Sequence, residues 1–233
     1  MAQIKQFTFN IFQERTAVAW NDGPACVIVD PGFYSARESL EFFQFIEQNG
    51  LEPEEVLITH AHFDHIYGVS EILEHWNIPV YMDPIEELSF EYNKQMVKRV
   101  SLDIPKPFPY TPVKEGDKIA AAGFTFETIS TPGHAPGALC FLDREKKIMF
   151  TGDTLFAGTI GRTDLLHSDY DQEILSIMNK LIILDPDIRF YPGHGLSSTI
   201  GRERTNNPFL EPFNEPEEPF DPDAEPVIIN GLY

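Results

Sequence analysis

The sequence has few of the features that mark secreted mini-domains or membrane proteins. It contains only two cysteines, Cys26 and Cys140, among 233 residues, which is too few for a disulfide framework. Both lie in apolar, strand-like runs, so we expect buried, reduced thiols in a cytoplasmic protein. No apolar run approaches the roughly 20 residues that span a bilayer, and no hydrophobic segment of a signal peptide follows Lys5.

Positive charge is also scarce. The chain carries 17 Lys and Arg against 37 Asp and Glu, a formal net charge of −20. A surface field of this sign repels phosphate backbones and anionic lipids, so we expect neither a nucleic-acid nor a membrane partner. With 42% hydrophobic and 23% charged residues, the composition excludes disordered and fibrous chains. A globular protein with a small-molecule substrate is expected, while the oligomeric state is left open.

Two similar halves follow one another along the chain, each with several strands before a helix. In the first half, alternation at Phe7, Phe9 and Ile11 predicts a strand, and Ser35 with Glu38 forms a capping box for a helix ending at Gly50. The apolar face of that helix is assigned to Leu40, Phe43, Phe45 and Ile46. Further strands are predicted at 16–20, 25–30, 56–59, 79–82, 118–121, 124–130, 139–143, 147–152 and 189–191, with helices at 68–76, from 83 onward and at 171–181.

This order of elements favours an α+β fold in which two sheets pack face to face with helices outside. We assign residues 1–210 to one domain. Residues 211–233 begin with the segment EPFNEPEEPFDPDAE, which has seven acids and no bases. Its proline density is incompatible with a helix or a central strand, so we predict an acidic, Pro-rich C-terminal tail.

The most informative segment is His60-Ala61-His62-Phe63-Asp64-His65. Three of the seven histidines of the chain stand in this window, together with an aspartate. Imidazole and carboxylate donors at such spacing suit zinc or iron. In an extended segment His60 and His62 lie on one side and can share one metal, while Asp64 and His65 lie further along for a second ion.

Five strand-like runs end in a potential metal ligand, and a site built on several strand ends has rigid supports. Glycines accompany three of them, where the backbone must turn sharply beneath the metals. The five residues are Asp30, His60, His134, Asp153 and His194, and the glycines are Gly133, Gly152 and Gly193.

The HAHFDH segment, with the TPGH, TGD and PGHG blocks downstream, resembles the metallo-β-lactamase superfamily from about residue 5 to residue 210. It is similar to the short glyoxalase II-like (hydroxyacylglutathione hydrolase-like) branch. The resemblance implies a four-layer αβ/βα sandwich of two mixed sheets with outer helices. It also implies two divalent ions, zinc first with iron or manganese as alternatives. One ion is expected on His60, His62 and His134, and the other on Asp64, His65 and His194, with Asp153 bridging.

The resemblance further implies a hydrolase acting on a small 2-hydroxyacyl thioester through a metal-bridging hydroxide, with Asp64 holding that nucleophile. We expect Asp30 to orient a ligand by hydrogen bonding rather than to bind metal. Arg162 and Arg202 are the candidates to meet an anionic thioester, although Arg162 could instead pair with Asp164.

Two other functions remain open at this point. A persulfide dioxygenase-type oxidoreductase would hold a single iron with His60, His134 and Asp153, which are a subset of the same ligands. A closed structural zinc site is disfavoured, because seven ligands exceed the four that such a site uses.

Overall fold

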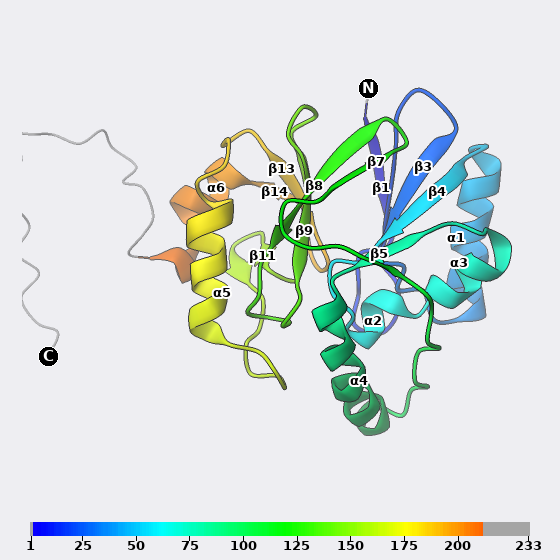
Figure 1. Cartoon of the computed structure of the whole chain (residues 1–233), viewed down its shortest axis with the longest axis horizontal. Helices are drawn as coiled ribbons and strands as arrows, with labels where there is room; N and C mark the ends of the chain where they lie inside the picture. Colours follow the sequence, from blue (N-terminus) through cyan, green and yellow to red (C-terminus); the bar gives the residue numbers. More distant parts are fainter. Residues whose placement is uncertain (1, 212–233) are drawn as a thin grey trace, which may run out of the picture.

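The computed structural model describes residues 2–211 of the chain (Figure 1). The predicted tail at 211–233 therefore lies outside the described residues except for Glu211, and the domain boundary at 210 stays a prediction. In the described residues, two six-stranded mixed sheets form the framework of the molecule. The first sheet has the order β1 (Gln3–Gln6), β2 (Ala17–Trp20), β3 (Ala25–Val29), β4 (Glu52–Leu57), β5 (Val80–Met82) and β6 (Thr111–Pro112).

The second sheet repeats the mixed character of the first, with β10 and β13 parallel and the other neighbours antiparallel. Its order is β14 (Ser198–Thr199), β13 (Arg189–Pro192), β10 (Ile148–Gly152), β9 (Leu139–Asp143), β8 (Phe124–Ser130) and β7 (Lys118–Ala121). A small hairpin of β11 (Leu155–Phe156) and β12 (Thr159–Ile160) follows β10.

Helices cover the outer faces of both sheets, so the predicted sandwich is confirmed (Figure 1). On one side lie α1 (Ala36–Gln48) and α3 (Val69–His75), and on the other α5 (Tyr170–Ser176) and α6 (Ile200–Asn206). Helix α5 continues as a π-helical turn, Ile177–Leu181. The one-turn helix α2 (Phe63–Ile66) and the longer α4 (Glu87–Val100) lie together at one end of the sheets. Short 3₁₀ turns occupy Pro84–Glu86 and Pro208–Leu210.

Three apolar layers hold the sheets and their outer helices together, and a fourth, smaller cluster of Phe63, Tyr92 and Val97 joins α2 to α4. Between the sheets, Val27 and Leu57 pack in one cluster with Phe126 and Phe141. The outer face of the first sheet packs on α1 and α3, and that of the second sheet packs on α5, its π-helical turn and α6. Because each sheet is covered on both faces, its central strands are buried almost throughout.

Two local predictions were wrong. The strand predicted at Phe7–Ile11 lies too late in the sequence. The observed strand β1 is Gln3–Gln6, and Ile11 is 70% exposed in a turn. In α1 the capping box of Ser35 and Glu38 is present, but Leu40 is 58% exposed. The buried stripe is Ser39, Phe42 and Ile46, because positions three and four residues apart share a helix face and Leu40 lies off that line.

The cysteines behave as predicted. Cys26 and Cys140 are both buried and free, and burial raises the pKa of each thiol to about 12. Among the described residues, no helix has the length and apolar character needed to cross a membrane.

Candidate metal centre

The five predicted strand-end residues all follow strands of the two sheets. Asp30 follows β3 and His60 lies just beyond β4, while His134, Asp153 and His194 follow β8, β10 and β13. Their loops gather at the end of the sandwich near α2 and α4 (Figure 1). Close approach also explains one glycine, because a Cβ at Gly193 would lie 2.4 Å from Asp153 Oδ1. Gly193 is thus needed for space beside the site.

The HAHFDH segment changes conformation in its middle. Residues from His60 to His62 are in the loop after β4, and His62 stands at the N-cap position of the helix α2, which begins at Phe63. One helical turn then carries Asp64 and His65 back toward the strand ends. The pairing of His60 with His62, and of Asp64 with His65, follows from this change.

The first donor group is formed by His60, His62 and His134, whose ligand atoms all lie within 4.8 Å of one another. His134 Nε2 is 3.0 Å from His62 Nδ1 and 3.5 Å from Asp153 Oδ2. His60 Nε2 lies 4.0 Å from the same Asp153 oxygen. All of these side chains are buried or nearly so.

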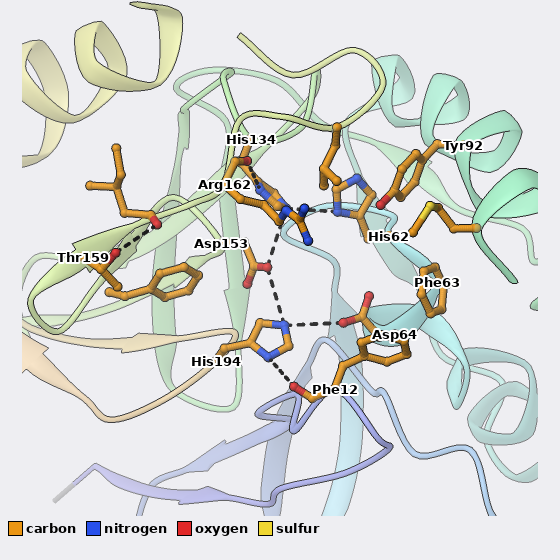
Figure 2. Close-up of a pocket in the computed structure, with 14 residues that line it drawn as sticks. Phe12, His62, Phe63, Asp64, Tyr92, His134, Asp153, Thr159, Arg162 and His194 are labelled. Carbon is orange, nitrogen blue, oxygen red and sulfur yellow. Dashed lines mark hydrogen bonds and ion pairs between the residues drawn. The ribbon is translucent and has the colours of Figure 1, made fainter. Parts of the chain in front are cut away.

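Asp64, His65 and His194 form the second donor group, again with ligand atoms within 4.8 Å. His194 Nε2 is 3.4 Å from Asp64 Oδ2 and 3.5 Å from Asp153 Oδ2. His65 Nε2 faces Asp153 Oδ1 at 3.6 Å. Asp153 thus lies between the two groups, and Figure 2 shows it between His134 and His194. This is the position required of a bridging carboxylate.

Hydrogen bonds donated by Nδ1 fix how four of the five rings present their other nitrogen. His134 Nδ1 donates to the Arg162 carbonyl at 2.8 Å, and His194 Nδ1 donates to the Phe12 carbonyl at 3.0 Å. A carbonyl oxygen only accepts, so both rings keep the Nε2 lone pair for the centre. His62 differs, since it presents Nδ1 to His134.

Asp30, which the sequence predicts to orient a ligand, contacts both Thr59 and His65. Its carboxylate accepts hydrogen bonds from the Thr59 amide at 2.8 Å and the Thr59 hydroxyl at 2.5 Å, and from His65 Nδ1 at 3.2 Å. Because the Thr59 hydroxyl donates to Asp30, it can accept from His60 Nδ1 at 3.1 Å. Asp30 thereby orients both rings, although it also lies within ligand distance of His60 and His65.

Unsatisfied atoms at the centre provide a test of whether a metal fits. Among the described residues, His60 Nε2, His65 Nε2 and Asp153 Oδ1 are buried without a hydrogen-bond partner. Leaving such atoms unpaired costs about 1–3 kcal/mol each. Lone pairs on nitrogen and carboxylate oxygen are the donors that zinc and iron take. The His/Asp cluster therefore fits divalent metal ions, while the assignment of each ligand stays a prediction.

The histidine pKa shifts have opposite directions in the two donor groups. Burial, reinforced by neighbouring imidazoles, lowers the pKa of His60 and His62 well below the usual value. Burial acts in the same direction on His65 and His194, but Asp153 and Asp64 outweigh it and raise the pKa of both rings. Burial would raise the pKa of Asp153, yet facing His194 and His65 lower it well below the usual range. Asp153 is therefore a carboxylate, available as a ligand.

Two buried glutamates support the loops and were not found from the sequence. Glu173 Oε2 accepts from the His134 amide at 2.8 Å, and burial raises the pKa of Glu173 to about 9. Glu86 accepts from the Ala61 amide at 2.6 Å and the Gly137 amide at 2.7 Å, which ties the two histidine loops together. In the sequence both look like ordinary helical glutamates, so no pattern distinguishes them.

A cavity of about 330 Å³ opens onto the donors (Figure 2). Its walls combine Asp64, Asp153 and three of the histidines with aromatic side chains such as Phe63 and Tyr92. Arg162 lines the cavity and also pairs with Asp164 through two bonds of 2.7 and 2.8 Å, while its contact with a substrate stays a prediction. Arg202, the other predicted cation, is exposed on α6 and is not part of the cavity wall.

Sequence comparison places this site in a known family. Residues 16–194 match the profile of the Metallo-beta-lactamase superfamily, and the chain belongs to that superfamily as a hydrolase with a His/Asp metal-binding cluster. It is 36% identical over 204 residues to the Hydroxyacylglutathione hydrolase GloC of Haemophilus influenzae, covering 85% of this chain and 93% of the relative.

Two solved structures share both fold and sequence with the chain. The BLEG-1 B3 metallo-beta-lactamase superposes with a TM-score of 0.82 at 33% identity, covering 90% of this chain and all of the other. TTHA1623 in a di-iron-bound form gives 0.78 at 33% identity, covering 88% and 100%. Relatives of similar sequence identity are thus named for different activities, and one of them is known in a di-iron-bound form.

Proposed function

We propose that the protein hydrolyses a small 2-hydroxyacyl thioester in the manner of glyoxalase II. The reaction would use two divalent ions, for which zinc is the preferred candidate. The observation that carries the proposal is the pair of donor groups that share Asp153 at the floor of one cavity. The 36% identity with a hydroxyacylglutathione hydrolase supports the choice of a thioester. Two divalent ions held there would polarise a carbonyl and lower the pKa of a water molecule between them.

The side chains around the donors supply binding and orientation. Asp64 lines the cavity and can accept a hydrogen bond from the attacking water, which fixes the direction of its lone pair. Phe12, Phe63 and Phe156 give the cavity apolar walls that limit the room for an acyl group and exclude bulk water. These groups select a small, compact acyl chain.

The leaving group sets the class of ester. A thiol of pKa about 8.5 departs as a thiolate without help, whereas an amine needs a proton. His65 and His194 lower the pKa of both lining carboxyls, Asp64 and Asp153, against the effect of their burial. The two carboxyls, Asp64 and Asp153, are therefore ionised and are poor proton donors. The lack of a proton donor favours thioesters over amides as substrates.

A substrate panel tests the proposal. Zinc-loaded protein is expected to hydrolyse S-lactoylglutathione faster than a β-lactam, a phosphodiester or a glutathione persulfide, and elemental analysis to give two ions per chain. Asp64→Asn is expected to keep the fold, as judged by circular dichroism, and to lose most of the turnover. Wild-type turnover in that variant, together with one ion at full occupancy, would contradict the dinuclear mechanism.

One geometric observation keeps the alternative of a persulfide dioxygenase in the test. His60, His134 and Asp153 lie together, with both imidazoles 3.5–4.0 Å from the same Asp153 oxygen. Three such donors can hold a single iron. Oxygen consumption with glutathione persulfide by an iron-loaded sample, without thioester turnover by the zinc-loaded one, would favour this reaction instead.

A further inference from the structure

A second cavity, of about 470 Å³, adjoins the metal cavity. The two share the side chains of Tyr92, Met96, Arg162 and Leu165, so they meet along one wall. The second cavity contains none of the predicted metal ligands and adds Gln95, Arg99, Asp164 and Leu166, of which Asp164 is the carboxylate that pairs with Arg162. A molecule bound at the metals can therefore extend over this wall without leaving the protein surface.

Helix α4 forms that wall with residues spaced along one face. Met96 and Arg99 follow Tyr92 by four and seven residues, and this spacing places the three side chains in a row on the helix. The Tyr92 ring packs against the His62 ring with centroids 4.7 Å apart, so this end of the row touches the metal donors. Arg99 stands seven residues further, about 10 Å along the axis at 1.5 Å per residue.

Arg99 and Arg162, the two arginines that line the second cavity, differ in their ion pairing. Arg162 is held by Asp164 through Nε and Nη2, which leaves Nη1 to donate elsewhere. Arg99 is exposed, and its guanidinium contacts the Met96 sulfur at 4.0 Å but no carboxylate among residues 2–211. In a protein of net charge −20, an arginine that pairs with no carboxylate in the described part of the chain and stands beside the site is a local attraction for anions.

We propose that the second cavity binds the thiol carrier of the substrate, with Arg99, assisted by Arg162, receiving an anionic group of the carrier about 10 Å beyond Tyr92. This inference rests on the proposed thioester hydrolysis and adds where the carrier lies and what recognises it. The apolar stem of the carrier would pass over Met96 and Leu165. A carboxylate and a phosphate both satisfy a guanidinium, so the test includes a carrier of each kind.

Binding and turnover are measured separately, so that the two proposals can fail separately. Calorimetry follows the binding of S-methylglutathione, a carboxylate carrier that cannot be hydrolysed, and of desulfo-coenzyme A, a phosphate carrier. Arg99→Ala is compared with Lys98→Ala, which removes the same charge from an exposed neighbour that lines neither cavity. Kinetics use S-lactoylglutathione and the uncharged S-lactoyl-N-acetylcysteamine.

Arg99→Ala is expected to weaken the binding of one of the two carriers about fivefold to tenfold, and Lys98→Ala to leave it unchanged. The KM for S-lactoylglutathione should rise by a similar factor with kcat within twofold if the carboxylate carrier is the one affected, while the neutral thioester is unaffected. If wild type and Arg99→Ala bound both carriers with the same affinity, the proposed subsite would be wrong. The same conclusion would follow if Lys98→Ala lost as much affinity as Arg99→Ala. Arg99-dependent carrier binding without any thioester turnover would overturn the proposed reaction alone.

Discussion

At the scale of single residues, the centre depends on groups that hold its ligands rather than on the ligands alone. Four of the five imidazoles are oriented by an acceptor behind the ring, and the acceptors are two loop carbonyls, the Thr59 hydroxyl and the Asp30 carboxylate. The amides of the same loops are held in turn by buried glutamates. Such supporting contacts typically change metal affinity or activity by about 10–100-fold when they are removed.

Glu173→Ala provides the test at this scale. The substitution leaves the His134 amide without its acceptor, and we expect metal affinity, measured by competition with a chelator, to fall about tenfold or more. Glu173→Gln keeps a carbonyl oxygen for the amide and should recover most of the loss. Asp171→Ala, on the exposed side of the same helix, is the control. Equal affinity in Glu173→Ala and Asp171→Ala would mean that Glu173 has no part in positioning His134.

At the scale of elements, the loops do more to define the site than the strands that carry them. The switch from extended chain to helix at Phe63 sends His60 and His62 to one donor group, and Asp64 and His65 to the other. Helix α4 then presents its Tyr92–Arg99 face beside them. The strands supply rigid ends, while the loops determine which donors meet.

One strand carries a titratable group that makes stability depend on pH. Burial, together with the adjacent Glu54 carboxylate, raises the pKa of Glu55 in β4 to about 7. The ordinary value is 4.5, so the charged form is favoured in the unfolded chain, and this residue's contribution to stability is lost as the pH rises from about 5 to above 7.

Glu55→Gln removes that loss. We expect its melting temperature, relative to wild type, to be higher at pH 8 than at pH 5 by roughly 2–4 °C. Glu52→Gln, exposed on the same strand, should show the same difference from wild type at both pH values. The interpretation of Glu55 fails if the two variants behave alike.

How far the sequence predicts these elements depends on the range of the interactions involved. Strand ends carrying His134 or Asp153 were found because an apolar run and a polar terminus are local signals. The stripe of α1 was misplaced onto Leu40, because the face that packs on the sheet is chosen by tertiary contacts. Glu86 and Glu173 were missed for the same reason, since their amide partners are 25 and 39 residues away.

At the scale of the whole molecule, the described part of the chain contains every predicted ligand, from His60 to His194. A chain ending near residue 210 is therefore expected to bind metal and turn over substrate at rates within twofold of the full chain. Elemental analysis and the thioester assay on both chains check this. Loss of metal on truncation would show that the acidic segment after residue 210 contributes to the site.

The donors also come from both halves of the sandwich. His60, His62, Asp64 and His65 follow a strand of the first sheet, whereas His134, Asp153 and His194 follow strands of the second. Any cation held by both sets acts as a cross-link between the halves, closing a loop of 72 residues from His62 to His134 or of 129 residues from His65 to His194. Because such a cross-link exists only in the folded chain, occupancy of the two donor groups adds to the free energy of unfolding, and a chelator is expected to lower the melting temperature of the whole sandwich.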